Sequence, residues 1–122
     1  MVQSESPREY NPYLGRELST LLILATLNAK KNSSTYELIK DIKMKTENRI
    51  FFRAGTIYPH MVKLESDGIL QKRIVDTTSH SEGVTRQKSV YSLTQKGIEV
   101  LNNKKGDWKD LQSIINQLLS ET

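Results

Sequence analysis

The sequence contains no cysteine, which excludes disulfide bonds and metal sites built on thiolates. Histidine is almost as scarce, because His60 and His80 are the only two, and their spacing does not suit a shared metal ion. A glycine-rich phosphate loop is also missing, and no serine, histidine and aspartate are grouped as a nucleophilic triad would require. We therefore expect a protein that is not an enzyme and has no metal or cofactor.

Long apolar runs are missing as well. The longest is LLILA, residues 21–25, far short of the roughly 20 residues that cross a bilayer. The N-terminus is polar and has no hydrophobic signal region, so we expect a cytoplasmic protein without a membrane partner. With 122 residues, of which 36% are apolar and 26% charged, the chain is long enough for one small core and is expected to be globular.

Positive charge is concentrated in the middle of the chain. Residues 30–105 contain fifteen Lys and Arg against eight Asp and Glu, a net charge of +7. The remaining residues carry −3, which gives the chain its total of +4. A basic region of this kind is typical of proteins that bind a polyanion, although a solvated lysine-rich surface gives the same composition.

The first half of the chain predicts two helices. The stretch ELSTLLILATLNA, residues 17–29, is almost wholly apolar and indicates a central helix. Residues 1–15 show no periodicity, and we expect them to form a flexible arm. Ser34 and Glu37 have the spacing of a capping box, which predicts the start of a second helix.

The stretch GTIYPHMVKLESDGIL, residues 55–70, predicts a third helix with two different faces. Ile57, Met61 and Leu64 fall on one apolar stripe, which suits packing on a core. The residues roughly opposite are polar or conformationally restricted and face outward: Thr56, Pro59, Lys63 and Ser66. Such a face is what a helix needs to enter a DNA groove.

The ends of this third helix are predicted from capping residues. Thr56 is the expected N-cap, which puts Pro59 at the third helical position, where its missing N–H is tolerated. Asp67 and Gly68 provide the expected stop.

A hairpin is predicted next. Residues 70–78 and 86–93 have the composition of two strands, and the polar residues 79–83 between them predict a turn. Four cations lie on the two strands: Lys72, Arg73, Arg86 and Lys88. Helix, basic hairpin and helix in this order are typical of a winged helix.

The chain ends in a long predicted helix that begins after Thr94, a plausible N-cap, and is expected to be interrupted near Gly106. Its apolar residues follow heptad-like steps, with Lys104 as one polar interruption: Leu101, Trp108, Leu111, Ile115 and Leu118. This seam has more apolar surface than one small core needs, so we expect it to pair with a second copy. Packing on the chain's own first helix is the alternative.

These stretches together resemble the PadR family of transcriptional regulators. The resemblance rests on LLILATL (21–27), TYELIKDI (35–42), GTIYPHMVKLESDGIL (55–70), Gly83 with Arg86 and Lys88, and YSLTQKG (91–97). The chain departs from the family pattern at Ser33-Ser34, where a His-Gly pair is common, and in the hairpin, which lacks the usual G-R-x-R-K-Y-Y run.

The resemblance implies a mainly α fold with a small β-hairpin wing. Residues 16–93 would form a winged helix-turn-helix, and residues 94–122 a single C-terminal dimerisation helix, as in the short subfamily. It further implies a homodimer that binds double-stranded DNA at a pseudo-palindromic operator, as a repressor relieved by a small molecule. Trp108 lies where some short members place a tryptophan at the dimer centre, where paired rings can sandwich a flat aromatic ligand.

Site residues follow from this resemblance and from the outward faces. The candidates for groove or phosphate contact on the third helix are Thr56, Tyr58, Pro59, His60 and Lys63. Lys72, Arg73, Arg86 and Lys88 would hold phosphates. Tyr36 either touches the DNA backbone or packs in the core, and Tyr58 and His60 border the core.

Two other functions remain open at this point. The chain is alternatively a nucleic-acid or chromatin-associated winged-helix protein without a specific operator, or an interaction module that has lost DNA binding. Composition and motifs do not separate these from a specific regulator.

Overall fold

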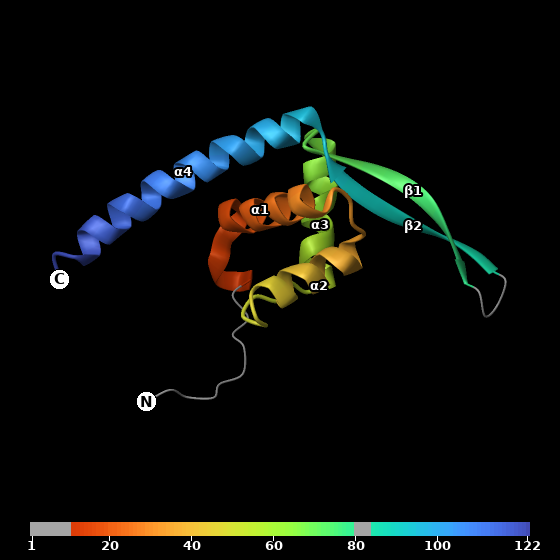
Figure 1. Cartoon of the computed structure of the whole chain (residues 1–122), viewed down its shortest axis with the longest axis horizontal. Coiled ribbons are helices and arrows are strands. Elements are labelled where there is room, and N and C mark those ends of the chain that lie inside the picture. The colour runs from red at the N-terminus through yellow and green to blue at the C-terminus, as the bar shows by residue number, and fades with distance from the viewer. Residues whose placement is uncertain (1–10, 80–83) are drawn as a thin grey trace.

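Four helices and one antiparallel hairpin make up the protein (Figure 1). The computed structural model describes the backbone of residues 11–79 and 84–122 and the side chains of residues 15–77 and 86–122. The elements are α1 (Asn11–Lys30), α2 (Thr35–Lys45), α3 (Ala54–Ser66), β1 (Leu70–Ser79), β2 (Val84–Leu93) and α4 (Gln95–Leu119). The predicted mainly α fold with a β-hairpin wing is confirmed. Residues 1–10 of the predicted arm and 80–83 of the predicted turn lie outside the described residues.

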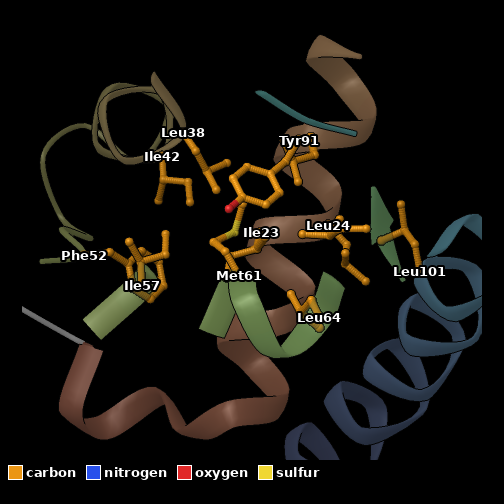
Figure 2. Close-up of a cluster of buried hydrophobic side chains, with 12 residues drawn as sticks. Ile23, Leu24, Leu38, Ile42, Phe52, Ile57, Met61, Leu64, Tyr91 and Leu101 are labelled. Atoms are coloured by element: carbon orange, nitrogen blue, oxygen red, sulfur yellow. The ribbon is translucent and has the colours of Figure 1, made fainter. Parts of the chain in front are cut away.

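The core lies between α1, α2 and α3 and is closed by residues from β2 and α4 (Figure 2). Ile23 and Leu24 of α1 and Met61 of α3 are completely buried at its centre. The other members come from all six elements and one linker: Leu27, Leu38, Ile42, Phe52, Ile57, Leu64, Leu70, Tyr91 and Leu101. The predicted stripe on α3 is therefore confirmed, and it faces α1 and α2.

Helix α1 begins earlier than its apolar pattern indicates. Residues 11–14 are helical, and Gly15 interrupts the helix with φ 72° and ψ 169°, a conformation that glycine adopts without strain. The main segment of α1 therefore starts directly after this kink. The central helix predicted for residues 17–29 lies entirely within that segment.

The predicted capping box of α2 is confirmed. The Glu37 backbone N–H donates to the Ser34 hydroxyl at 3.2 Å, and the Ser34 backbone N–H donates to a Glu37 carboxylate oxygen at 2.9 Å. Two backbone donors that the helix itself leaves without acceptors are thus satisfied.

Helix α3 does not begin where the sequence indicates. Its N-cap is Arg53, whose carbonyl accepts from the N–H groups of both Thr56 and Ile57 at 2.9 Å, so the predicted Thr56 cap is wrong. Pro59 consequently lies at the sixth helical position, well inside the helix. It has no N–H to donate to the carbonyl of Gly55, which is exposed.

The end of α3 is joined tightly to the start of α4. Gly68, with φ 76°, ends α3 as predicted, and the Ile69 N–H reaches back to the Leu64 carbonyl at 2.9 Å. Thr94 caps α4 as predicted, because its hydroxyl accepts from the Gly97 N–H at 3.0 Å. The same hydroxyl lies 2.6 Å from the Gly68 carbonyl oxygen, to which it donates. This junction sets the direction of α4 relative to α3.

The wing is the β1–β2 hairpin, which projects away from the helices (Figure 1). Its register runs from the Leu70–Leu93 pair at the base to the Ser79–Val84 pair. At the base, Tyr91 also exchanges two backbone hydrogen bonds with Ser33, of 2.8 and 3.0 Å, which ties the α1–α2 connection to the outer edge of β2.

Helix α4 is continuous, and the predicted interruption near Gly106 is wrong. Its first half packs along α1, and its second half extends past the other helices (Figure 1). Every residue from Lys105 to Thr122 is exposed. The C-terminal half of α4 therefore contributes little to the core of its own chain.

Candidate nucleic-acid interface

The outward face of α3 is polar and accessible. Thr56, Tyr58, Pro59 and Lys63 are all exposed, although Ile57 between them is 1% exposed. The predicted separation of a buried and an open face is therefore present. Tyr58, which the sequence places at the border of the core, has 53% of its surface accessible. More than half of this residue is thus open to a ligand.

His60 differs from its neighbours because it is engaged inside the protein. A hydrogen bond of 2.8 Å joins its Nε2 to the Thr20 hydroxyl of α1, and the side chain is only partly exposed. Burial lowers the pKa of His60, and the nearby Arg16 charge lowers it further. The neutral ring therefore links α3 to α1, and DNA contact by His60 stays a prediction.

Lys63 is paired with a carboxylate just past the end of its helix. Its ammonium lies 3.1 Å from an Asp67 oxygen, one turn further along, and both side chains are well exposed. An exposed pair of this kind contributes at most a few tenths of a kcal/mol. Lys63 can therefore exchange Asp67 for a phosphate or a guanine edge at little cost.

Tyr36 lies at the start of α2 and is 75% exposed. The alternative in which it packs in the core is therefore wrong. The core positions of α2 are filled by Leu38 and Ile42, and Tyr36 projects from a different side of the helix. It lines an open hollow together with Lys40, Met44 and other residues of α2.

The four wing cations do not share one face. Successive side chains of a strand point to opposite faces, and cross-strand partners share a face. Arg73 lies opposite Val90, Lys88 opposite Val75 and Arg86 opposite Thr77, so these three cations are on one face. Lys72 lies opposite Tyr91 and is on the other face. A single DNA backbone along the wing would therefore meet three of the predicted cations.

Lys88 also connects the wing to α2. Its ammonium lies 3.3 Å from the second oxygen of Glu37, the carboxylate of the capping box. The pKa of Glu37 is below its ordinary value because the Ser34 N–H donates to it and because Lys88 lies nearby. The sequence predicts the cap from its spacing, but the link to Lys88 spans 51 positions and has no local signal.

The apolar seam of α4 is divided between the core and the surface. Leu101 is 3% exposed and belongs to the core of its own chain, so its predicted place at a dimer interface is wrong. From Trp108 onward the predicted seam is open: Trp108 is 37% exposed, Leu111 47%, Ile115 40% and Leu118 61%. Lys104, the polar interruption, is ion-paired with Glu17 of α1.

Comparison with known proteins identifies the family. The model of the PadR-like transcriptional regulators matches residues 23–103. The chain belongs to this family. A PadR family transcription regulator from Clostridium difficile is similar in structure, with a TM-score of 0.70 and 27% identity over 86% of this chain and 99% of that chain. The comparison with curated proteins gave no match.

Two further solved structures share the fold. A transcriptional regulator from Clostridium thermocellum has a TM-score of 0.71 and 24% identity over 84% of this chain and 93% of that chain. A winged-helix DNA-binding protein from STIV has a TM-score of 0.60 and 20% identity over 78% of this chain and 91% of that one.

PadR-like proteins are DNA-binding regulators of transcription and not enzymes, so the predicted class of function is confirmed at this level. The family match covers all candidates on α2, α3 and the wing, but it ends before Trp108. Within the described residues, no group of three or more acidic or histidine side chains is placed to hold a metal ion. None of the described helices is long and apolar enough to span a membrane.

Proposed function

We propose that this PadR-like protein is a homodimeric, sequence-specific regulator that represses transcription from a pseudo-palindromic operator. The observation that carries the proposal is the open face of α3, with Thr56, Tyr58 and Lys63 exposed above a stripe that is fully packed. A helix held rigidly on one side and polar on the other fits the major groove of B-DNA.

The two flanks of α3 supply positions for the phosphate backbone. Tyr36 projects from the start of α2, and Arg73, Arg86 and Lys88 share one face of the wing. These residues would fix the register of the protein on the duplex, and the residues of α3 would read bases. The basic middle of the chain supports the same assignment.

The exposed half of α4 supports a dimer. Trp108, Leu111, Ile115 and Leu118 recur at heptad-like steps on a helix that its own chain leaves uncovered. Pairing two such helices would cover these side chains and hold two α3 helices for successive grooves about 34 Å apart.

Trp108 also suggests where a small aromatic effector would bind. Its ring lines an open hollow of about 210 Å³ between α1 and α4, together with Leu18, Leu21 and Leu111. A flat ligand stacked on this ring would lie at the proposed dimer seam, where it would change the distance between the two α3 helices.

The proposal is tested by selecting binding sites from a random duplex pool and measuring affinity for the selected and scrambled sites across a range of salt concentrations. A specific regulator keeps its preference as salt weakens the electrostatic contribution. Equal affinity and equal salt slopes on all duplexes would identify a general nucleic-acid binder. A chain that binds no duplex would be an interaction module.

Lys63→Ala tests the face of α3 directly. We expect a roughly 5- to 100-fold loss of affinity for the selected site if Lys63 contacts a base, with dimerisation unchanged. Lys105→Ala removes the same charge from an exposed position on α4 and serves as the matched control. Equal affinities of the two variants would exclude Lys63 from the DNA-contacting face.

A further inference from the structure

A cavity of about 330 Å³ lies between the start of the main α1 segment and the outward side of α3. It is open to solvent and has room for about ten water molecules. Its floor is apolar and includes Phe52 and Ile57. The polar side chains that line it are all cations, hydroxyls or imidazole, and no carboxylate is among them: Arg16, Ser19, Thr56, His60 and Lys63.

One wall of this cavity is formed by the first residues of a helix segment that follows the kink at Gly15. Because φ of Gly15 is 72°, the main segment of α1 begins at the cavity, and both Gly15 and Arg16 line it. Backbone N–H groups at a helix start have no acceptor within the helix, and the helix dipole places partial positive charge there. This wall therefore favours an anion.

Ser19, one turn further along α1, is an independent sign of a ligand. It is only 6% exposed and lines the cavity, and no group in the described part of the chain hydrogen-bonds to its hydroxyl. Because the residue is almost covered by protein while its hydroxyl lacks a partner among the described residues, this hydroxyl can hydrogen-bond to an oxygen of a molecule held in the cavity.

The charges around the cavity point to the same kind of ligand. Arg16 is exposed and forms no ion pair with the described residues, while the neighbouring Glu17 is paired with Lys104 on α4. Burial lowers the pKa of His60, and the charge of Arg16, which lines the same cavity, lowers it further.

We propose that the α1–α3 cavity binds a phosphate group. A guanidinium, two hydroxyls, an ammonium and a helix start are the donors that phosphate sites in proteins use. The phosphate comes either from the DNA backbone or from a small phosphorylated molecule. The case in which the phosphate belongs to DNA rests on the proposed function, because Thr56 and Lys63 line the cavity and also belong to the face proposed to enter the groove.

The first experiment uses no DNA. The ¹⁵N-labelled full chain is titrated with inorganic phosphate and with pyrophosphate at constant ionic strength, with chloride as the replaced anion. Binding in the cavity shifts the amide signals of residues 15–20, 56–58 and 60–63, and it raises the pKa of His60 because the bound anion offsets the Arg16 charge. Arg16→Ala should weaken this binding roughly tenfold, whereas Lys105→Ala should leave it unchanged.

The second experiment measures the salt dependence of DNA binding for the same variants. If a backbone phosphate occupies the cavity, Arg16→Ala lowers the slope of log K against log salt concentration by about one. Ser19→Ala, which changes no charge, should then weaken binding a few-fold at an unchanged slope. This variant separates the cavity from a chance surface contact of Arg16.

The two experiments together identify the source of the phosphate or exclude the site. Localised shifts with free phosphate and an unchanged slope for Arg16→Ala identify a small phosphorylated molecule as the ligand. A lowered slope together with the Ser19→Ala effect identifies the DNA backbone. Localised shifts in a chain that binds no duplex would remove the proposed function and keep the phosphate site. No localised shifts and an unchanged slope would overturn the site.

Discussion

Gly97 lies where α4 touches the end of α3, and replacing it with alanine should destabilise the protein strongly. A Cβ atom at this position would be 2.2 Å from the Ile69 carbonyl oxygen and 3.3 Å from the Leu93 Cβ. An ordinary contact between carbon and oxygen is about 3.3 Å, so α4 would have to move back by about 1 Å. The first contact is with backbone, which cannot swing away as a flexible side chain does.

The size of the effect follows from what this movement breaks. Thr94 donates to the Ile69 carbonyl from its backbone N–H at 3.1 Å, and its hydroxyl proton is shared between the Gly68 carbonyl at 2.6 Å and the Ile69 carbonyl at 3.1 Å. Overpacking costs about 1–3 kcal/mol, and each weakened hydrogen bond adds about 1 kcal/mol. The higher helix propensity of alanine offsets about 1 kcal/mol of this destabilisation. We therefore expect Gly97→Ala to lower the free energy of unfolding by about 2–4 kcal/mol, or the Tm by roughly 10 °C.

Gly106 provides the matched control in the same helix. An added Cβ there meets no atom within 4 Å, so Gly106→Ala should raise the free energy of unfolding by about 0.5–1 kcal/mol. Urea unfolding followed by circular dichroism measures both variants, at several protein concentrations because the exposed part of α4 is a proposed dimer contact. A Gly97→Ala protein as stable as the wild type would refute the close approach of α4 to Ile69.

Two further predictions concern the proposed dimer and the α2 cap. Trp108→Ala should weaken self-association, seen as a shift towards monomer in sedimentation velocity at micromolar concentration, and an unchanged profile would place the seam elsewhere. Glu37→Gln should lower the free energy of unfolding at pH 7 by about 0.5–1 kcal/mol, since Glu37 completes the capping box and faces Lys88. The pKa of Glu37 is below its ordinary value of 4.5, so its contribution is present above that pH and is lost on acidification. The two proteins should thus converge in stability as acidification below pH 4.5 protonates Glu37, and a stability difference that stays constant on acidification would contradict this cause.

Local patterns were sufficient to predict much of the fold. The spacing of Ile57, Met61 and Leu64 predicts the packed face of α3 because a helix repeats every 3.6 residues. Ser34 and Thr94 predict two helix starts because a short oxygen-bearing side chain reaches the free N–H groups there. Each of these signals needs only residues within about two turns of one another.

The errors arose where distant groups decide the outcome. Leu101 looks like part of the exposed seam, but it is buried because α4 lies over α1 at that point and diverges from the other helices only later. Helix α3 begins at Ala54, after the Arg53 cap, and the preceding Phe52 is anchored in the core, where it is 1% exposed. The α1–α3 cavity joins residues 15–19 to residues 56–63, and no spacing in the sequence predicts that meeting.

The junction of Gly68, Thr94 and Gly97 fixes one end of α4, so a small rotation there produces a large displacement at the other end. A helix of 25 residues is about 37 Å long, so a rotation of 5° at its fixed end moves its far end by about 3 Å. In a dimer joined through the far half of α4, a movement of that half would be transmitted back to the fixed end of the helix and to α3. A displacement of a few ångströms at Trp108 would turn each α3 by several degrees and change the spacing of the two helices on the operator. In the proposed dimer, the contact of Gly97 with the Ile69 carbonyl would be the pivot of this motion, and its stiffness would determine how much of a displacement at the dimer seam is transmitted to α3.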